Sequence, residues 1–208
     1  MTELAAESPD VDFDVIVIGG GVAGCVAAYQ LARANRSVAL IERGSEPGSK
    51  NLSGGVLYSR VMEQVFPSFL SAAPVERRIT RNCLSFLSPT SIVTLDYWDQ
   101  RLAEPVNAVT VLRARLDAWL AAQCEEVGVM VMPGVRVDRL VLEGDQVVGV
   151  RAGEDELRAH LVIAADGVNS FIAQAAGVRA KEPSKHLAVG VKSVIRLPRE
   201  VLEQRFGV

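Results

Sequence analysis

The sequence predicts an α/β fold built on a parallel β-sheet. The 208 residues are 49% hydrophobic and 23% charged, a globular composition that allows one large domain or one and a half ordinary ones. Apolar, β-branched runs at residues 15–18 and 37–41 flank a helical stretch, and a third apolar run follows at 161–165. Runs of this kind are typical of strands buried on both faces of a parallel sheet.

A glycine-rich turn follows the first run and opens a helix. Gly19, Gly21 and Gly24 have the G-x-G-x-x-G spacing. The first glycine permits a tight turn, the second lets backbone approach a pyrophosphate, and the third lets the helix pack closely on the strand. The free N–H groups and the positive dipole end of that helix can then bind phosphate. Taken alone, the spacing is also typical of a strand-to-helix turn without a ligand.

An acidic residue strengthens the interpretation as a nucleotide site. Glu42 ends the second run, near the interval at which an acid bonds a ribose hydroxyl. Strand, glycine turn, helix, strand and acid therefore occur in the expected order, and we predict dinucleotide binding. Glu42 disfavours a 2′-phosphate, although the adjacent Arg43 leaves room for one.

Charge and cysteine content argue against several other classes. A formal charge of −3 gives no basic footprint, so no nucleic-acid partner is expected. The three cysteines are scattered and only two histidines occur, which indicates neither a disulfide framework nor a metal site and fits a reducing cytosol. Residues 15–28 are apolar, but glycines interrupt them and acidic residues precede them, so we expect neither a signal peptide nor a membrane span. Peripheral contact with a membrane surface stays open.

The third apolar run ends in a second motif, Ala165-Asp166-Gly167, with a helix expected beyond it. An aspartate at this place is commonly a helix N-cap. It can also contact a nucleotide, because the carboxyl ends of parallel strands meet at one edge of the sheet. After a dinucleotide motif, we favour the contact.

The remaining chain is divided by its turn signals. Residues 1–12 are small, polar and acidic and are expected to form a disordered tail. Residues 44–55 are rich in glycine and small polar residues, which predicts either an ordinary surface loop or one whose Gly54 and Gly55 let backbone lie against a flat ligand. Further expected elements are a short helix at 59–65, hairpin strands at 83–87 and 92–98, a helix at 112–127, a buried strand at 129–132 and a β-meander with strands at 135–142, 146–151 and 156–160.

With these pieces in order, the chain resembles the FAD-dependent oxidoreductases of the glutathione-reductase-like group, which have a Rossmann-like FAD-binding domain. More closely, it is similar to the FixC family, relatives of electron-transfer flavoprotein–quinone oxidoreductase. The likeness covers about residues 13–208 and depends on the motifs at 19–24, 42–43, 47–58, 112–117 and 165–167. The Lys50-Asn51…Gly54-Gly55 element is the discriminating one, and geranylgeranyl-reductase relatives carry a looser version of it.

The resemblance implies FAD as the cofactor. The three motif glycines and Arg113 would approach the pyrophosphate, Glu42 the adenosine ribose, and Asp166 a second part of FAD. For Arg113, an ordinary solvated surface charge is the alternative. Lys50, Asn51, Gly54 and Gly55 would lie near the flavin edge, where the cation of Lys50 could stabilise the reduced anionic flavin. The implied cofactor-binding residues are Gly19, Gly21, Val22, Ala23, Gly24, Glu42, Arg43, Lys50, Asn51, Gly54, Gly55, Arg113, Val135, Ala165, Asp166 and Gly167.

The resemblance also implies an activity and a domain plan. Electrons would pass from an electron-transfer flavoprotein-type donor toward quinone, with a ferredoxin-like protein as a further partner, in the cytoplasm or at the inner face of the membrane. No catalytic side chain is expected, because the flavin carries the chemistry. Alternatives are a flavin monooxygenase, a geranylgeranyl-reductase-type enzyme, or an inactive nucleotide-binding module.

Family members continue beyond this length through a substrate domain and a late Gly-Asp motif. We therefore expect a truncated product or a fragment. Residues 13–180 would form the FAD-binding domain, with an inserted hairpin region at about 68–108. Residues 181–208 would start a truncated antiparallel substrate domain, whose first strand is predicted at 186–197. Such a chain would expose apolar surface.

Overall fold

The computed structural model describes residues 11–51, 53–191, 193 and 195–206. The predicted tail at 1–12 therefore lies, up to residue 10, outside the described residues.

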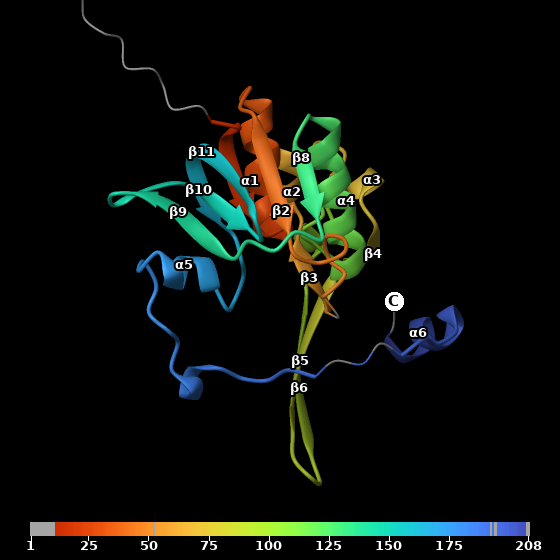
Figure 1. Cartoon of the computed structure of the whole chain (residues 1–208). Coiled ribbons are helices and arrows are strands. Elements are labelled where there is room, and N and C mark those ends of the chain that lie inside the picture. Colours follow the sequence, from red (N-terminus) through yellow and green to blue (C-terminus); the bar gives the residue numbers. More distant parts are fainter. Residues whose placement is uncertain (1–10, 52, 192, 194, 207–208) are drawn as a thin grey trace, which may run out of the picture.

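A six-stranded sheet forms the centre of the molecule, in the order β8-β2-β1-β11-β10-β9 (Figure 1). Strand β1 pairs in parallel with β2 and β11, and β2 pairs in parallel with β8. Strand β10 is antiparallel to β9 and β11, so the predicted parallel sheet with a meander is confirmed. The strands are β1 Phe13–Ile18, β2 Val38–Glu42, β8 Met130–Pro133, β9 Arg139–Glu143, β10 Gln146–Ala152 and β11 Asp155–Ala164.

Strand β11 joins two runs that were predicted as separate strands, at 156–160 and 161–165. It pairs antiparallel with β10 up to Arg158 and parallel with β1 from Ala159 onward. No turn residue interrupts it, so one strand serves both ladders. Its predicted burial on both faces is wrong in part, because Leu161 is 50% exposed. The buried strand expected at 129–132 is likewise an edge strand, with Met130 54% exposed.

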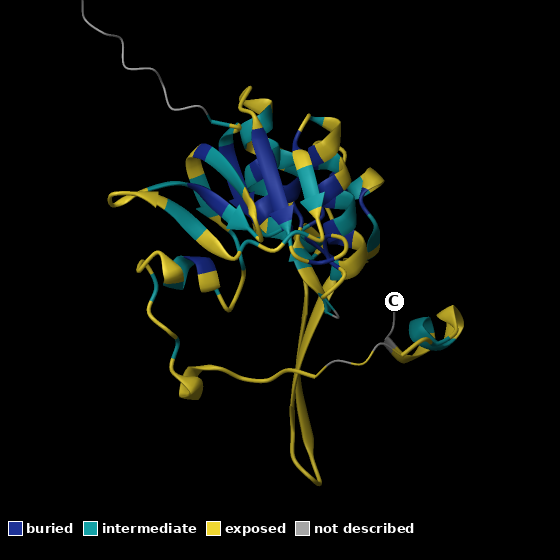
Figure 2. Ribbon diagram, viewed as in Figure 1, coloured by how far each residue is buried: buried dark blue, intermediate teal, exposed yellow. Residues whose placement is uncertain are grey.

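Two helices cover one face of the parallel strands. They are α1 Val22–Arg33 and α4 Arg113–Glu126, and they contact each other. Alternate residues of β1 point to opposite faces. Val15 and Val17 belong to the same core cluster as Leu116 of α4, whereas Ile16 and Ile18 pack in a second cluster with residues of the meander and α5. Figure 2 shows this buried centre between exposed outer segments.

A second sheet has the order β3-β7-β4 and consists of β3 Gly54–Tyr58, β7 Ala108–Leu112 and β4 Val75–Ile79. Gly54 and Gly55 therefore begin a strand, and the prediction that they belong to a loop is wrong. They pair with Leu112 and Val111. That partner strand lies more than fifty residues later, and glycine itself has little strand preference, so the local pattern could not indicate the pairing.

The predicted hairpin is confirmed as β5 Arg81–Leu87 and β6 Ile92–Trp98. It projects from the sheets, and every residue of its two strands is exposed (Figures 1 and 2). Two short helices, α2 Arg60–Val65 and α3 Phe69–Ala72, connect β3 to β4 within the second sheet, and η1 Gln100–Leu102 lies between the hairpin and β7.

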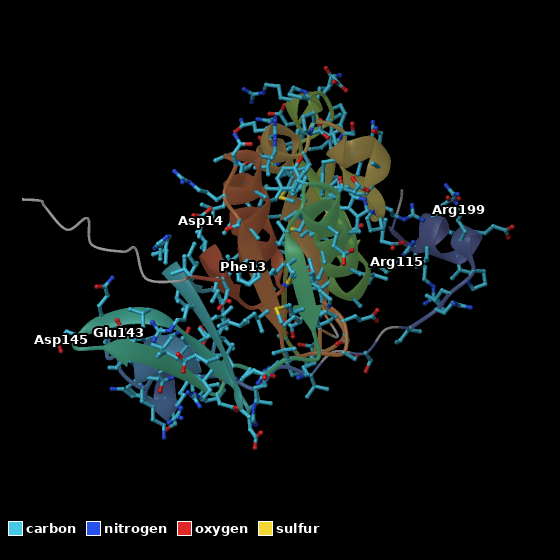
Figure 3. All side chains as sticks on the ribbon, turned by 45° about the horizontal axis from the view of Figure 1, so that its top comes forward. Phe13, Asp14, Arg115, Glu143, Asp145 and Arg199 are labelled. Atoms are coloured by element: carbon cyan, nitrogen blue, oxygen red, sulfur yellow. The ribbon has the colours of Figure 1, made fainter. Side chains whose placement is uncertain are left out.

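The last part of the chain runs over α5 Phe171–Ala175, η2 Ser184–His186 and α6 Arg199–Phe206. None of the described residues between 186 and 197 is in a strand, so over these residues the predicted strand is not borne out. Alternating apolar residues make a strand only where another strand supplies hydrogen bonds. Figure 3 labels Arg199 on α6, apart from the sheet, and Glu143 and Asp145 at the turn between β9 and β10.

Candidate functional site

The segments that follow the parallel strands meet at one edge of the sheet. The Gly19 N–H donates to the Ile41 carbonyl at 2.8 Å, and the Ala165 N–H donates to the Ile18 carbonyl at 2.8 Å. The Val135 N–H donates to the Glu42 carbonyl at 3.0 Å. A cavity of about 420 Å³ opens at this edge.

Most of the residues predicted to bind the cofactor line this cavity. They are Gly19, Gly21, Glu42, Arg43, Lys50, Asn51, Arg113, Val135, Ala165, Asp166 and Gly167. The predicted residues Val22, Ala23, Gly24, Gly54 and Gly55 lie outside its lining. The lining also includes Arg136, Asn169 and Phe171, which no sequence motif indicated. They follow strands or precede a helix without a distinctive motif.

The glycine turn packs too tightly for side chains. Gly19 has a φ of +109°, and a Cβ there would lie 2.4 Å from the Ala165 carbonyl oxygen. A Cβ on Gly24 would lie 1.9 Å from the Gly19 carbonyl oxygen. These two glycines thus allow β1, α1 and the turn after β11 to pack closely together. At Gly21, a Cβ would lie 3.6 Å from the Arg113 Nη2, so this glycine is next to the guanidinium.

The N-terminus of α1 is open to a ligand. Its N-cap is Gly21, and no side chain of the described residues caps it. The first turn contains no acidic residue. Because the first N–H groups of a helix have no partner within it, this end presents hydrogen-bond donors and positive potential to an anion. Val22 and Ala23 lie outside the cavity lining, and their contribution of backbone N–H groups to a ligand stays a prediction.

Glu42 is held by two backbone amides. Its Oε2 accepts from the Gly20 N–H at 2.8 Å, and its Oε1 accepts from the Gly44 N–H at 2.6 Å. Each carboxylate oxygen can accept a second hydrogen bond. The side chain thus presents fixed acceptors in the cavity wall, as a ribose hydroxyl requires.

Arg113 is paired with a carboxylate behind the cavity. Its Nε and Nη2 donate to Oδ1 and Oδ2 of Asp117, both at 2.7 Å. The Asn51 Nδ2 donates to the same Oδ2 at 2.8 Å. The hydrogen bonds to Asp117 raise the pKa of Arg113 above its ordinary value, while burial acts to lower it. Arg113 therefore brings a permanent positive charge to the cavity, held by Asp117, a residue for which no role was predicted from the sequence.

Asp166 divides its two oxygens between two tasks. Oδ2 accepts from the Ile172 N–H at 2.8 Å in the first turn of α5, so this oxygen acts as the helix cap that the sequence offered as one alternative. Oδ1 is buried and has no hydrogen-bond partner among the described residues. A buried acceptor without a partner costs free energy of about 1–3 kcal/mol. Since Asp166 lines the cavity, a hydroxyl or N–H of a ligand can satisfy it.

Lys50 lies near the end of β2. Its Nζ donates to the Arg43 carbonyl at 3.4 Å, beside Glu42. Its role at the flavin edge stays a prediction, and so do those of Asn51, Gly54 and Gly55.

The donor set of the cavity fits FAD. The uncapped end of α1 and the Arg113 guanidinium can bind a diphosphate, and the fixed oxygens of Glu42 can bind a ribose. The buried Oδ1 of Asp166 can accept a hydrogen bond from a further donor of the cofactor. Among the described residues, no group of histidine, cysteine and acidic side chains could hold a metal ion, and no helix is long and apolar enough to cross a membrane.

Relatives of known sequence point to the same cofactor. The family described as "FAD binding domain" matches residues 12–204. The chain is 50% identical over 200 residues to a probable electron transfer flavoprotein-quinone oxidoreductase, YdiS, of Escherichia coli K12, covering 96% of this chain and 47% of YdiS. It is 45% identical over 195 residues to the protein FixC of Salmonella typhi, covering 93% of this chain and 46% of FixC. The chain thus spans about half the length of these curated relatives.

Solved structures share the fold. A geranylgeranyl bacteriochlorophyll reductase-like protein from Thermoplasma acidophilum has a TM-score of 0.65 at 25% identity, covering 79% of this chain and 42% of that one. An aklavinone-11 hydroxylase in complex with FAD and aklavinone has a TM-score of 0.62 at 24% identity, covering 82% of this chain and 36% of that one. With a family match that spans nearly the whole chain, this protein belongs to the FAD binding domain family, its cofactor is FAD, and its sequence is similar to those of FixC and YdiS.

Proposed function

We propose that this chain forms the adenosine-diphosphate end of the FAD site in an oxidoreductase that passes electrons from an electron-transfer flavoprotein-type donor toward quinone. The observation that carries the proposal is the convergence on one cavity of the uncapped end of α1, the Arg113 guanidinium and the carboxylates of Glu42 and Asp166.

Each group has a separate task in holding FAD. The N–H groups at the start of α1 and the free donors of Arg113 bind the diphosphate, which carries the negative charge. The oxygens of Glu42 accept from the ribose hydroxyls, since its two backbone donors fix their direction. Asp166 Oδ1 accepts a hydrogen bond from another part of the cofactor.

The chemistry belongs to the bound flavin, which accepts and donates electrons and thereby connects two redox partners. The chain's own residues bind and orient the cofactor. No side chain of the cavity is assigned to proton transfer, because electron transfer between a flavoprotein and a quinone does not require a strong acid or base held by the protein.

The partners are proposed from the similarity to YdiS, whose printed name describes a probable electron transfer flavoprotein-quinone oxidoreductase. Its 50% identity exceeds the 25% identity to the geranylgeranyl reductase-like structure, which favours electron transfer over a reductase or monooxygenase reaction. Quinones reside in lipid bilayers, so this proposal includes a peripheral contact at the inner face of the membrane. A ferredoxin-like partner belongs to the same proposal.

Titration of the purified chain with FAD tests cofactor binding. We expect quenching of the flavin fluorescence, a saturable absorbance spectrum, and weaker binding by Arg113→Ala. The matched control is Arg115→Ala, because Arg115 pairs with Glu76 and lies outside the cavity lining. A chain that stays colourless and acquires no flavin spectrum at saturating FAD contradicts the proposal.

Electron transfer is tested with the FAD-loaded chain. A reduced electron-transfer flavoprotein is mixed with it and with a short-chain quinone, and flavin oxidation is followed by absorbance. We expect quinone reduction that depends on the loaded chain. Loss of electrons to molecular oxygen alone, with the quinone left oxidised, contradicts transfer to quinone. A chain that binds FAD and transfers no electrons indicates a nucleotide-binding module.

A further inference from the structure

Asp117 is a charged side chain without any solvent contact. It is 0% exposed, and the only other polar residue that is fully buried among those described is Ser59. Removing a carboxylate from water is costly unless charged or hydrogen-bonding partners replace the lost hydration. Its position on α4, behind the cavity rather than in its lining, requires a physical reason.

The partners of Asp117 both line the cavity. Arg113 gives it two hydrogen bonds of 2.7 Å, and Asn51 gives it one of 2.8 Å. Gly48 lies directly over it, since a Cβ there would come within 2.9 Å of the Asp117 Cβ. One buried carboxylate thus connects the arginine at the start of α4 with the loop that follows Glu42 and Arg43.

Arg113 occupies a place that disfavours a cation. It is the first residue of α4, where the helix dipole is positive. It is also 32% exposed, so a guanidinium without its carboxylate partner could turn toward water. The bidentate pair instead keeps Nη2 close to Gly21, the N-cap of α1. Arg113 and Gly21 therefore line the same cavity side by side.

We propose that Asp117 is a positioning residue of the diphosphate subsite. It holds Arg113 over the N-terminus of α1, and through Asn51 it fixes the loop at 47–51 against α4. This inference depends on the proposed binding of FAD, and it concerns how the site is preorganised.

Two effects of Asp117 oppose each other. Its negative charge reduces the positive potential at the diphosphate, whereas its geometry orients the arginine. Positioning dominates because the two oxygens engage only Nε and one Nη2 hydrogen, which leaves three guanidinium N–H groups for a ligand. A bidentate pair also gives those groups a fixed direction, which a free arginine lacks.

A double-mutant cycle on the full chain tests this role. The probe is ADP, which carries the diphosphate without the flavin, and its affinity is measured by calorimetry for wild type, Asp117→Asn, Arg113→Gln and the double variant. We expect Asp117→Asn to weaken ADP binding about tenfold, the loss expected for a charge-assisted contact. In the Arg113→Gln background the same substitution should have no further effect.

Glu76→Gln is the matched control. Glu76 of β4 forms an ion pair of 2.7 Å with Arg115, which lies on α4 like Asp117. Both residues are outside the cavity lining, so loss of this ion pair should leave the ADP affinity unchanged. Arg113→Gln is the variant most at risk of misfolding, because it leaves the fully buried Asp117 carboxylate without its guanidinium. Where it does not fold, the comparison of wild type with Asp117→Asn still tests the role, because that variant leaves only the partly exposed Arg113 unpaired.

The outcomes separate the two proposals. Equal ADP affinity for wild type and Asp117→Asn, tighter binding by the variant, or an equal loss in both backgrounds overturns the positioning role and leaves FAD binding intact. A wild-type chain that binds neither ADP nor FAD contradicts the proposed function itself.

Discussion

The carboxylate of Glu42 accepts a hydrogen bond of 2.8 Å from the backbone N–H of Gly20. This contact joins the end of β2 to the glycine turn before α1, across 22 positions of sequence. The acid expected to bind the ribose and the turn expected to bind the diphosphate are therefore parts of one rigid wall, completed by the Gly44 N–H.

Replacing Glu42 with glutamine tests that wall. In Glu42→Gln the side chain has a single acceptor oxygen, so its NH₂ group must face one of the two backbone N–H groups, donor against donor. We expect the free energy of unfolding to fall by about 1–2 kcal/mol and FAD affinity to fall about tenfold, measured by denaturant unfolding and fluorescence titration. The same substitution at Glu154, exposed in the turn after β10, should change neither.

The close approach at Gly24 makes a prediction about stability. The methyl of Gly24→Ala would overlap the Gly19 carbonyl oxygen at 1.9 Å, so α1 must move away from the turn. We expect a loss of about 2–3 kcal/mol in the free energy of unfolding, with weaker FAD binding. Gly55→Ala is the stability control, because its methyl meets no atom within 4 Å. Equal stability of the two variants would show that the helix does not pack this closely.

Asp166 allows its capping and ligand-binding tasks to be separated. In Asp166→Asn, the amide oxygen can still accept from the Ile172 N–H while the NH₂ group replaces the orphaned Oδ1. We expect thermal unfolding of the cofactor-free chain to change little and FAD affinity to fall about tenfold, because a donor replaces the acceptor. Asp166→Ala should lose both properties. Unchanged FAD affinity in the asparagine variant would indicate that Asp166 only caps α5.

The three cysteines should differ in reactivity. Cys25 and Cys124 are fully buried, and the Cys124 thiol and burial together raise the pKa of Cys25. Cys83 is exposed, although its contact with Asp96 raises its pKa as well. Because thiolates react and buried thiols do not, a chromogenic disulfide reagent at pH 8 should label one thiol in the folded chain and three after unfolding. In Cys83→Ser, rapid labelling of the folded chain would contradict this arrangement.

Local sequence patterns predicted the parts of the fold that depend on local contacts. The β1–α1–β2 unit, the meander and the β5–β6 hairpin follow from periodicity, turn residues and the glycine spacing. The pairing of Gly54 and Gly55 with β7 could not be predicted, since it joins residues far apart in the chain. The opposite error occurred at 186–197, where alternating apolar residues predicted a strand. None of the described residues there is in a strand, because alternation alone does not supply a pairing strand.

The candidate site shows the same division. Motifs identified most of the cavity lining, because each follows a strand of one parallel sheet. Asp117 had a local signal, its spacing of four from Arg113, yet only the fold shows that it is buried and also bonded to Asn51. The two tasks of Asp166 likewise became separable only in the structure, where Oδ2 accepts from the Ile172 N–H and Oδ1 has no partner among the described residues.

The central claim is that the N-terminus of α1 and Arg113 bind the diphosphate of FAD. Backbone and arginine side-chain NMR spectra of the full chain, recorded during titration with ADP, test it most directly. We expect the largest shifts at the amides of Val22 and Ala23 and at the Arg113 Nε–H, with none in the β5–β6 hairpin. Saturable binding that leaves those three signals in place would contradict the account.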